Sequence, residues 1–297
     1  MSVFTGSAVA IVTPMNDDLT VNFSKLDELL EWHIANKTDA IVICGTTGES
    51  ATLSEEEHMA VVKHCVETVN HRIPVIAGTG SNSTETAINL SKEAESYGVD
   101  ACLVVTPYYN KATQDGLKRH YSDISDALHT PIIMYNVPSR TGCNIRPETA
   151  AWLCHNTENV RGIKEASGDI SQIAKTKELC GDQIELYSGN DDQVIPIMAL
   201  GGLGVISVLS DVAPEYTHDM CARMLDGDVK EAAAMQLKAL PLIEALFCEV
   251  NPIPVKTALN MMGFEVGALR GPLYGMSEAG QERLRAALTD FGIQLKK

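Results

Sequence analysis

Short runs of apolar residues recur along the chain, and each run precedes a stretch whose apolar residues have helical spacing. The runs are continuous rather than alternating, which suits strands that are buried on both faces of a parallel sheet. Most runs repeat at about 30 residues, the size of one βα unit. The predicted strands are 8–12, 40–44, 74–77, 101–105, 131–135, 160–164, 184–188 and 203–208.

The segments between the runs predict helices, and Ser54 with Glu57 forms a capping-box pattern at the start of one of them. Eight strands that alternate with helices predict a (β/α)8 TIM barrel. A doubly wound open sheet is the alternative, but no GxGxxG follows a strand. Further helices after residue 209 predict a catalytic barrel over residues 1–227 and a C-terminal helical domain over residues 228–297. The predicted helices are 23–36, 55–70, 84–97, 116–128, 147–154, 170–180, 213–225, 229–250, 254–262 and 277–291.

Composition excludes several classes of protein. Of the 297 residues, 45% are hydrophobic and 21% are charged, which is ordinary for a globular chain. The net charge of −16 would be repelled by a phosphate backbone, so we expect no nucleic-acid partner. No apolar run approaches the roughly 20 residues of a membrane span, so we expect no membrane association. The N-terminal sequence lacks the basic region of a signal peptide, so we expect a cytoplasmic protein.

The 8 cysteines and 8 histidines show no spacing typical of metal ligands. No CxxC pair and no HExxH is present, so we expect no metal site. Scattered single cysteines favour reduced thiols in a cytosolic protein.

Lys164 is the most informative residue at a predicted strand end. Active sites of such barrels lie at the C-terminal ends of the strands, and Lys164 ends the apolar sixth strand. Burial there would lower its pKa and supply a free amine that can attack a carbonyl. The alternative is a lysine that reaches solvent or pairs with Glu165.

Other strand ends carry polar groups that suit the same site. Tyr135 ends the neighbouring strand, where its phenol could transfer a proton, or could simply be a packed aromatic. Thr46 and Thr47 lie between two glycines, where they could bind a small carboxylate or serve only the turn. Arg140 could hold a carboxylate with two hydrogen bonds, or form a surface ion pair.

Two adjacent tyrosines, Tyr108 and Tyr109, follow the fourth predicted strand. Two neighbouring side chains cannot easily serve one pocket. One of them could therefore pack outward or reach into a neighbouring subunit.

Six motifs together carry a resemblance over nearly the whole chain: GTTGES, AGTGSN, VTPYYN, YNVPSRTG, GIKEASG and SGND, with NPIPVK near the C-terminus. The chain resembles the dihydrodipicolinate synthase family, a branch of the N-acetylneuraminate lyase family of pyruvate-dependent class I aldolases. The resemblance implies a barrel with C-terminal helices, usually a homotetramer. It also implies condensation of pyruvate with L-aspartate 4-semialdehyde in diaminopimelate and lysine biosynthesis, through a covalent lysine–pyruvate Schiff base and without another cofactor.

The resemblance assigns roles to the candidate residues. Lys164 would form the Schiff base, while Tyr135, Thr46 and Tyr109 would make a proton relay, with Tyr109 entering from the adjacent subunit. The remaining assignments concern substrate binding. Thr47, with Gly189 and Ile206, would bind the pyruvate carboxylate, and Arg140 would hold the carboxylate of the semialdehyde.

The resemblance also implies an effector site, because bacterial synthases of this family are inhibited by lysine at a subunit interface. The residues that match this site are Ser50, Ala51, His58, Asn82 and Tyr108. Glu55 stands where a histidine is common, and Thr86 where a glutamate is common. The Thr86 difference removes a carboxylate that would meet the effector's ammonium group, so lysine inhibition is not expected from the resemblance alone.

Two rival functions follow from the same residues. A sialic acid or keto-deoxy sugar-acid lyase would use the same amine, although Arg140 and the tyrosine pair resemble the synthase branch more. A barrel that binds a keto acid as a sensor, without turnover, is the alternative outside enzymes.

Overall fold

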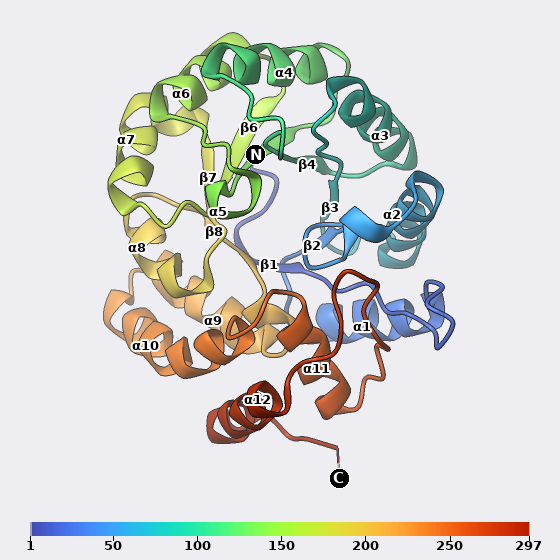
Figure 1. Cartoon of the computed structure of the whole chain (residues 1–297). Helices are drawn as coiled ribbons and strands as arrows, with labels where there is room; N and C mark the ends of the chain where they lie inside the picture. Colours follow the sequence, from blue (N-terminus) through green and yellow to red (C-terminus); the bar gives the residue numbers. More distant parts are fainter. Residues whose placement is uncertain (1, 297) are drawn as a thin grey trace.

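Eight parallel strands form a closed barrel in the computed structural model, which describes residues 2–296 (Figure 1). The strands neighbour one another in chain order, and β1 pairs with β8 to close the ring. The predicted (β/α)8 barrel is therefore confirmed. The strands are β1 (Gly6–Ala10), β2 (Ala40–Ile43), β3 (Val75–Gly78), β4 (Ala101–Val105), β5 (Ile132–Asn136), β6 (Val160–Glu165), β7 (Glu185–Ser188) and β8 (Gly204–Ser207).

Helices surround the strands and cover their outer face (Figure 1). The predicted capping box at α2 is confirmed, since the Ser54 side chain accepts from the Glu57 N–H and the Glu57 carboxylate accepts from the Ser54 N–H. The helices of the ring are α1 (Phe23–Ala35), α2 (Glu55–Val69), α3 (Thr84–Tyr97), α4 (Gln114–Asp126), α6 (Pro147–Asn156), α7 (Ile170–Cys180), α8 (Val194–Ala199) and α9 (Pro214–Leu225). The short helix α5 (Pro138–Thr141) follows β5 and lies inside this ring (Figure 1).

Alternate residues of each strand form two separate layers of the core. The inner layer fills the barrel with small and medium side chains and with Tyr135 and Tyr187. The outer layer packs against the ring of helices. The barrel interior is thus a packed core, and space for a ligand exists only at its ends.

An irregularity in β6 sets which of its side chains face inward. Val160 pairs with Ile132, but the next residue of β5, Ile133, pairs with Gly162, so Arg161 is an extra residue. Val160 and Ile132 lie in the outer layer and Ile133 in the inner one. Beyond this bulge the strand alternates regularly.

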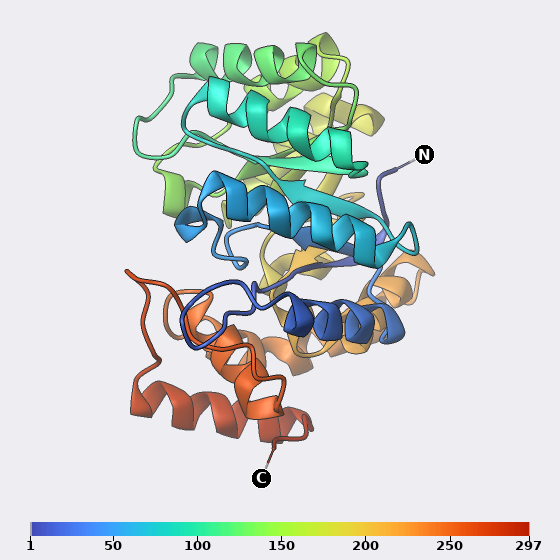
Figure 2. The same ribbon diagram turned by 90° about the vertical axis from the view of Figure 1, so that its right-hand side faces the viewer.

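Three further helices, α10 (Val229–Leu246), α11 (Ile253–Met262) and α12 (Glu278–Phe291), lie to one side of the barrel (Figure 2). Helix α10 packs against both α9 and α12. The Lys256 ammonium in α11 binds the Glu49 carboxylate at 2.7 Å, and both side chains are buried. A buried ion pair therefore connects the C-terminal helices to the turn after β2. The domain boundary at residue 227 stays a prediction.

No helix within residues 2–296 is both long enough and apolar enough to cross a membrane.

Candidate active site

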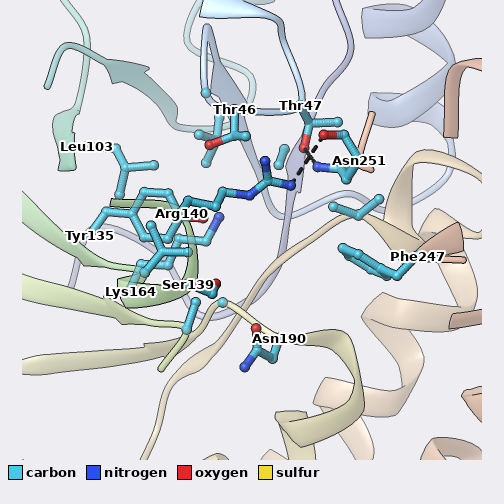
Figure 3. Close-up of a pocket in the computed structure, with 17 residues that line it drawn as sticks. Thr46, Thr47, Leu103, Tyr135, Ser139, Arg140, Lys164, Asn190, Phe247 and Asn251 are labelled. Carbon is cyan, nitrogen blue, oxygen red and sulfur yellow. Dashed lines mark hydrogen bonds between the residues drawn. The ribbon is translucent and has the colours of Figure 1, made fainter. Parts of the chain in front are cut away.

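Lys164 lies at the C-terminal end of β6 with its side chain directed into the mouth of the barrel (Figure 3). The residue is only 6% exposed, and its Nζ lies 4.3 Å from the centre of the Tyr135 ring. Tyr135 in β5 is the register partner of Lys164, which explains why the two side chains meet. A buried amine beside a phenol is thus present where the sequence predicted it.

Glu165 does not pair with Lys164, because consecutive strand residues point to opposite faces. Its buried carboxylate accepts two hydrogen bonds from the Asn136 amide and one from the Ser167 N–H. Burial raises the pKa of Glu165. The alternative of a Lys164–Glu165 ion pair is therefore wrong.

Gly189, after β7, leaves room for the Lys164 side chain. A Cβ at position 189 would lie 3.1 Å from Cε and Cγ of Lys164 and 2.8 Å from Cβ of Ala166. Any larger residue would push the lysine stem away from its present position. The glycine is needed here for space rather than for an unusual backbone conformation.

The mouth encloses a cavity of about 210 Å³, smaller than the roughly 300 Å³ at which drug-sized sites begin. A cavity of this size suits a substrate of few atoms. Six of the predicted site residues line it, and they come from four different strand ends. They are Thr46, Thr47, Tyr135, Arg140, Lys164 and Gly189.

The turn after β2 brings Thr46 and Thr47 to the cavity. The Glu49 N–H donates to the Thr46 carbonyl at 3.1 Å, and the Thr13 hydroxyl donates to the Gly48 carbonyl at 2.7 Å. Glu49 has a left-handed conformation with φ of 56°, which the surrounding bonds hold in place. The threonines are consequently fixed by the turn and the chain around it.

Arg140 extends from the short helix α5 across the cavity (Figure 3). Its Nη2 donates a hydrogen bond of 3.3 Å to the Asn251 carbonyl, rather than to a carboxylate. The guanidinium therefore retains donors that can hold a substrate carboxylate at the entrance.

Asn251 is a site residue that the sequence analysis did not single out. Its buried side chain donates from Nδ2 to the Thr47 hydroxyl at 3.0 Å, and its Oδ1 has no hydrogen-bond partner among residues 2–296 (Figure 3). The residue follows α10, so the strand-end rule could not find it. The one feature of the sequence that pointed to Asn251 was the NPIPVK motif, which it begins. Other lining residues without a predicted role include Phe247, Asn190, Ser139 and Val208.

Asp191 is a second buried carboxyl group close to this site. Its Oδ2 accepts N–H bonds from Val208 at 3.0 Å and Leu209 at 2.9 Å. Burial raises the pKa of Asp191, while these bonds and the charge of Lys164 act in the opposite direction. Its carboxylate adds negative potential near the lysine when it is ionised.

Two predicted site residues lie outside the cavity lining. Ile206 in β8 is buried in the inner layer of the barrel, the layer that also contains Tyr135. Tyr109 is 90% exposed and has a left-handed backbone with φ of 72°. Its side chain does not line the mouth of its own barrel, so a role in the relay would require another copy of the chain.

A second cavity of about 550 Å³ lies beside the mouth and shares Thr46 and Arg140 with it. Its walls include four of the predicted effector residues and both positions that depart from the effector site expected from the resemblance. These are Ser50, Ala51, His58 and Tyr108, with Glu55 and Thr86. Asn82 is not part of the lining, and its carbonyl accepts a bond from Asn110. Burial lowers the pKa of His58, whose ring donates to the Gly78 carbonyl at 2.7 Å.

No cluster of three or more histidine, cysteine or acidic residues suited to a metal ion occurs in the part of the chain that the structure describes.

The model of the dihydrodipicolinate synthetase family matches residues 3–291. The chain belongs to this family. The 4-hydroxy-tetrahydrodipicolinate synthase of Lachnoclostridium phytofermentans is 54% identical over 293 residues, which cover 99% of this chain and 100% of that one. The resemblance inferred from the motifs is therefore confirmed.

Solved structures of dihydrodipicolinate synthases have the same fold. The enzyme from Aquifex aeolicus has a TM-score of 0.97 at 41% identity and covers 99% of this chain and 100% of that one. The enzyme from Acinetobacter baumannii, solved in complex with pyruvate, has a TM-score of 0.95 at 46% identity, with coverage of 98% and 99%.

Proposed function

We propose that this protein condenses pyruvate with L-aspartate 4-semialdehyde to give 4-hydroxy-tetrahydrodipicolinate, through a Schiff base on Lys164 and without another cofactor. The observation that carries the proposal is the buried Lys164 amine, 4.3 Å from the Tyr135 ring centre, in a cavity sized for a small substrate. The names of full-length relatives at more than half identity support it.

The reaction begins when the Lys164 amine adds to the keto carbon of pyruvate and water leaves, which forms an iminium. The iminium withdraws electrons, so a methyl proton leaves to give an enamine. The enamine carbon attacks the aldehyde of the second substrate. The amine of that substrate then displaces Lys164 by transimination, which closes the ring and frees the enzyme.

Each step moves protons, and hydroxyl groups suit this task because they both donate and accept. We assign the relay to Tyr135, Thr46 and Tyr109. Tyr109 is almost fully exposed and lies outside the cavity lining of its own chain, so it would serve the mouth of a neighbouring copy. This assignment requires a homo-oligomer, and we propose a tetramer built from dimers in the cytoplasm.

Substrate binding uses the remaining polar groups of the mouth. Thr47, with the backbone at Gly189 and Ile206, would bind the pyruvate carboxylate. Arg140 would hold the carboxylate of the semialdehyde, because its guanidinium projects across the entrance and can donate two parallel hydrogen bonds.

The second cavity would bind lysine weakly. Glu55 and Thr86 line it in place of the histidine and glutamate that the resemblance leads one to expect. Turnover in the presence and absence of lysine tests this. Strong inhibition at low lysine concentration would contradict the proposal for this cavity.

Trapping with pyruvate and borohydride tests the covalent step. We expect a reduced pyruvate adduct on the Lys164 peptide, none in Lys164→Ala, and an unchanged adduct in Lys175→Ala, which removes an exposed lysine. A chain that binds pyruvate without forming this adduct would be a sensor rather than an enzyme. Coupled turnover with the semialdehyde, compared with cleavage of N-acetylneuraminate, separates the synthase from a sugar-acid lyase.

Arg140→Ala tests the assigned role of the arginine. We expect pyruvate adduct formation to persist while the rate with the semialdehyde falls. Loss of a charge-assisted bidentate contact corresponds to roughly 2–3 kcal/mol, or about 30- to 150-fold in kcat/KM. Unchanged semialdehyde kinetics would refute the role.

A further inference from the structure

Asn190 lines the mouth of the barrel, and none of the proposed steps uses its side chain. It follows Gly189, the residue that packs against the Lys164 stem. Figure 3 shows its amide below Arg140 and Lys164, with the oxygen turned toward them. A polar group therefore lies close to the reacting amine without an assigned role.

The backbone of Asn190 is fixed by hydrogen bonds, whereas its side chain is nearly free. The Asn190 N–H donates to the Ser188 hydroxyl at 3.2 Å, and the Asn190 carbonyl accepts from that hydroxyl at 2.7 Å and from the Gln193 N–H at 3.1 Å. The side chain makes one long contact, from Nδ2 to the Gln193 Oε1 at 3.5 Å, and its Oδ1 accepts no hydrogen bond within residues 2–296. The fold thus positions Asn190 and leaves an acceptor for a ligand.

The next residue, Asp191, anchors this turn from behind the mouth. Its carboxylate is buried and accepts the N–H bonds of Val208 and Leu209 at 3.0 and 2.9 Å. These bonds hold the end of β7 against the end of β8 without any contribution from the Asn190 amide. Truncation of Asn190 should therefore leave the fold intact.

The charges of the mouth indicate which part of a substrate needs a further acceptor. Of the described residues that line it, Arg140 and Lys164 are cationic and none is acidic. Arg140 offers donors to a carboxylate, whereas an amine brings N–H donors and needs an acceptor oxygen. Two other acceptors already have partners, since the Thr47 hydroxyl accepts from Asn251 and the Asn251 carbonyl accepts from Arg140.

We infer that Asn190 binds the amine of L-aspartate 4-semialdehyde through its Oδ1, while Arg140 holds the carboxylate on the same carbon. This inference rests on the proposed function, and it names the group that distinguishes an amino acid from an aldehyde acid without an amine. Ring closure requires the amine to reach the carbon bound to Lys164, and Asn190 follows the glycine that touches the lysine stem. An N–H donated to Oδ1 keeps the amine there and leaves its lone pair free to attack.

Two molecules that differ by one group test the inference. They are L-aspartate 4-semialdehyde and succinate semialdehyde, which keeps the aldehyde and the carboxylate but has no amine. Coupled turnover gives KM for the first, and competitive inhibition gives Ki for the second. Asn190→Ala should raise KM roughly 5- to 10-fold, as expected for one hydrogen bond, and leave Ki within about twofold. Arg140→Ala should weaken binding of both, because both contain the carboxylate.

Three controls separate binding of the amine from damage to the site. Asn190→Asp keeps an acceptor oxygen, so its KM should stay within about twofold of that of the unaltered chain. Asn156→Ala removes an exposed amide at the end of α6, outside the lining of the mouth, and should change neither constant. Trapping of pyruvate on Lys164 should proceed at the unaltered rate in both Asn190 variants, since it precedes binding of the semialdehyde.

Two results would overturn the inference. One is an unaltered KM in Asn190→Ala. The other is a parallel rise of KM and Ki in that variant, which would mean a change in the shape of the cavity rather than the loss of a contact with the amine. An unaltered chain that traps pyruvate but does not turn over the semialdehyde would refute the proposed function and the inference together, so the two failures can be told apart.

Discussion

Lys256→Met is expected to destabilise the chain strongly. The Lys256 ammonium is buried and donates to the Glu49 carboxylate at 2.7 Å, the Ala268 carbonyl at 2.7 Å and the Thr13 carbonyl at 3.0 Å. Methionine fills similar space but leaves the Glu49 carboxylate buried without its cation. Breaking a buried pair in this way costs about 3–5 kcal/mol in the free energy of unfolding.

The same variant should also slow turnover, because Glu49 ends the turn that carries Thr46 and Thr47. The Glu49 N–H bonds the Thr46 carbonyl, and its Oε2 accepts from the Arg270 N–H at 3.0 Å. Movement of this turn would shift the threonine hydroxyls relative to Lys164. We therefore expect kcat to fall in variants that still fold.

Urea unfolding at one fixed protein concentration, followed by circular dichroism, measures the stability loss. The double variant Lys256→Met with Glu49→Gln is the control, because it removes both charges while keeping an acceptor for Arg270. We expect the double variant to be more stable than Lys256→Met alone. A loss below about 1 kcal/mol in the single variant, or a double variant as unstable as the sum of the two single ones, would refute the reasoning.

Three further predictions concern other parts of the molecule. Gly189→Ala should slow pyruvate trapping at least about tenfold, because the added methyl would displace the Lys164 stem. It should also lower the free energy of unfolding by about 1–3 kcal/mol, because the methyl would press on Cβ of Ala166; an unchanged trapping rate would contradict this. Asn251→Ala should raise the KM for pyruvate about 5- to 10-fold, since the hydrogen bond to the Thr47 hydroxyl is lost; an unaltered KM would count against it. Burial lowers the pKa of His33 to about 3 from its usual 6.5, so the unfolded chain binds a proton that the folded chain does not bind. The contribution of neutral His33 to the free energy of unfolding is complete above about pH 6.5 and is lost as the pH drops toward 3. His33→Gln should therefore make the free energy of unfolding fall less steeply with decreasing pH, as measured by urea unfolding at several pH values. An identical pH dependence in the variant would disprove the assignment.

The βα alternation could be predicted from the sequence because parallel strands buried on both faces are apolar throughout. The predicted bounds of α3, α7 and β4 agree with the structure. Helices α5 and α8 were missed, because four and six residues are too few to show helical periodicity. The predicted first strand began two residues late, since Gly6 and Ser7 join β1 through pairing with β8.

The sequence predicted those site residues that lie at the C-terminal ends of strands. Lys164 and Tyr135 meet because they are register partners on adjacent strands. Asn251 was missed because it comes from a segment beyond the barrel, and only the folded chain shows that this segment reaches the mouth. The role of Tyr109 stays a prediction, since it depends on a second copy of the chain.

The bulge at Arg161 decides which deletions β6 can tolerate. If strict alternation ran from Val160 through Arg161, Lys164 would face the helices and Glu165 would point into the mouth. Deleting Arg161 itself would leave Val160 outward and Lys164 inward. Any single-residue deletion between Val160 and Lys164 would keep these orientations only if the bulge were lost with it, so a shortened β6 should be a regular strand.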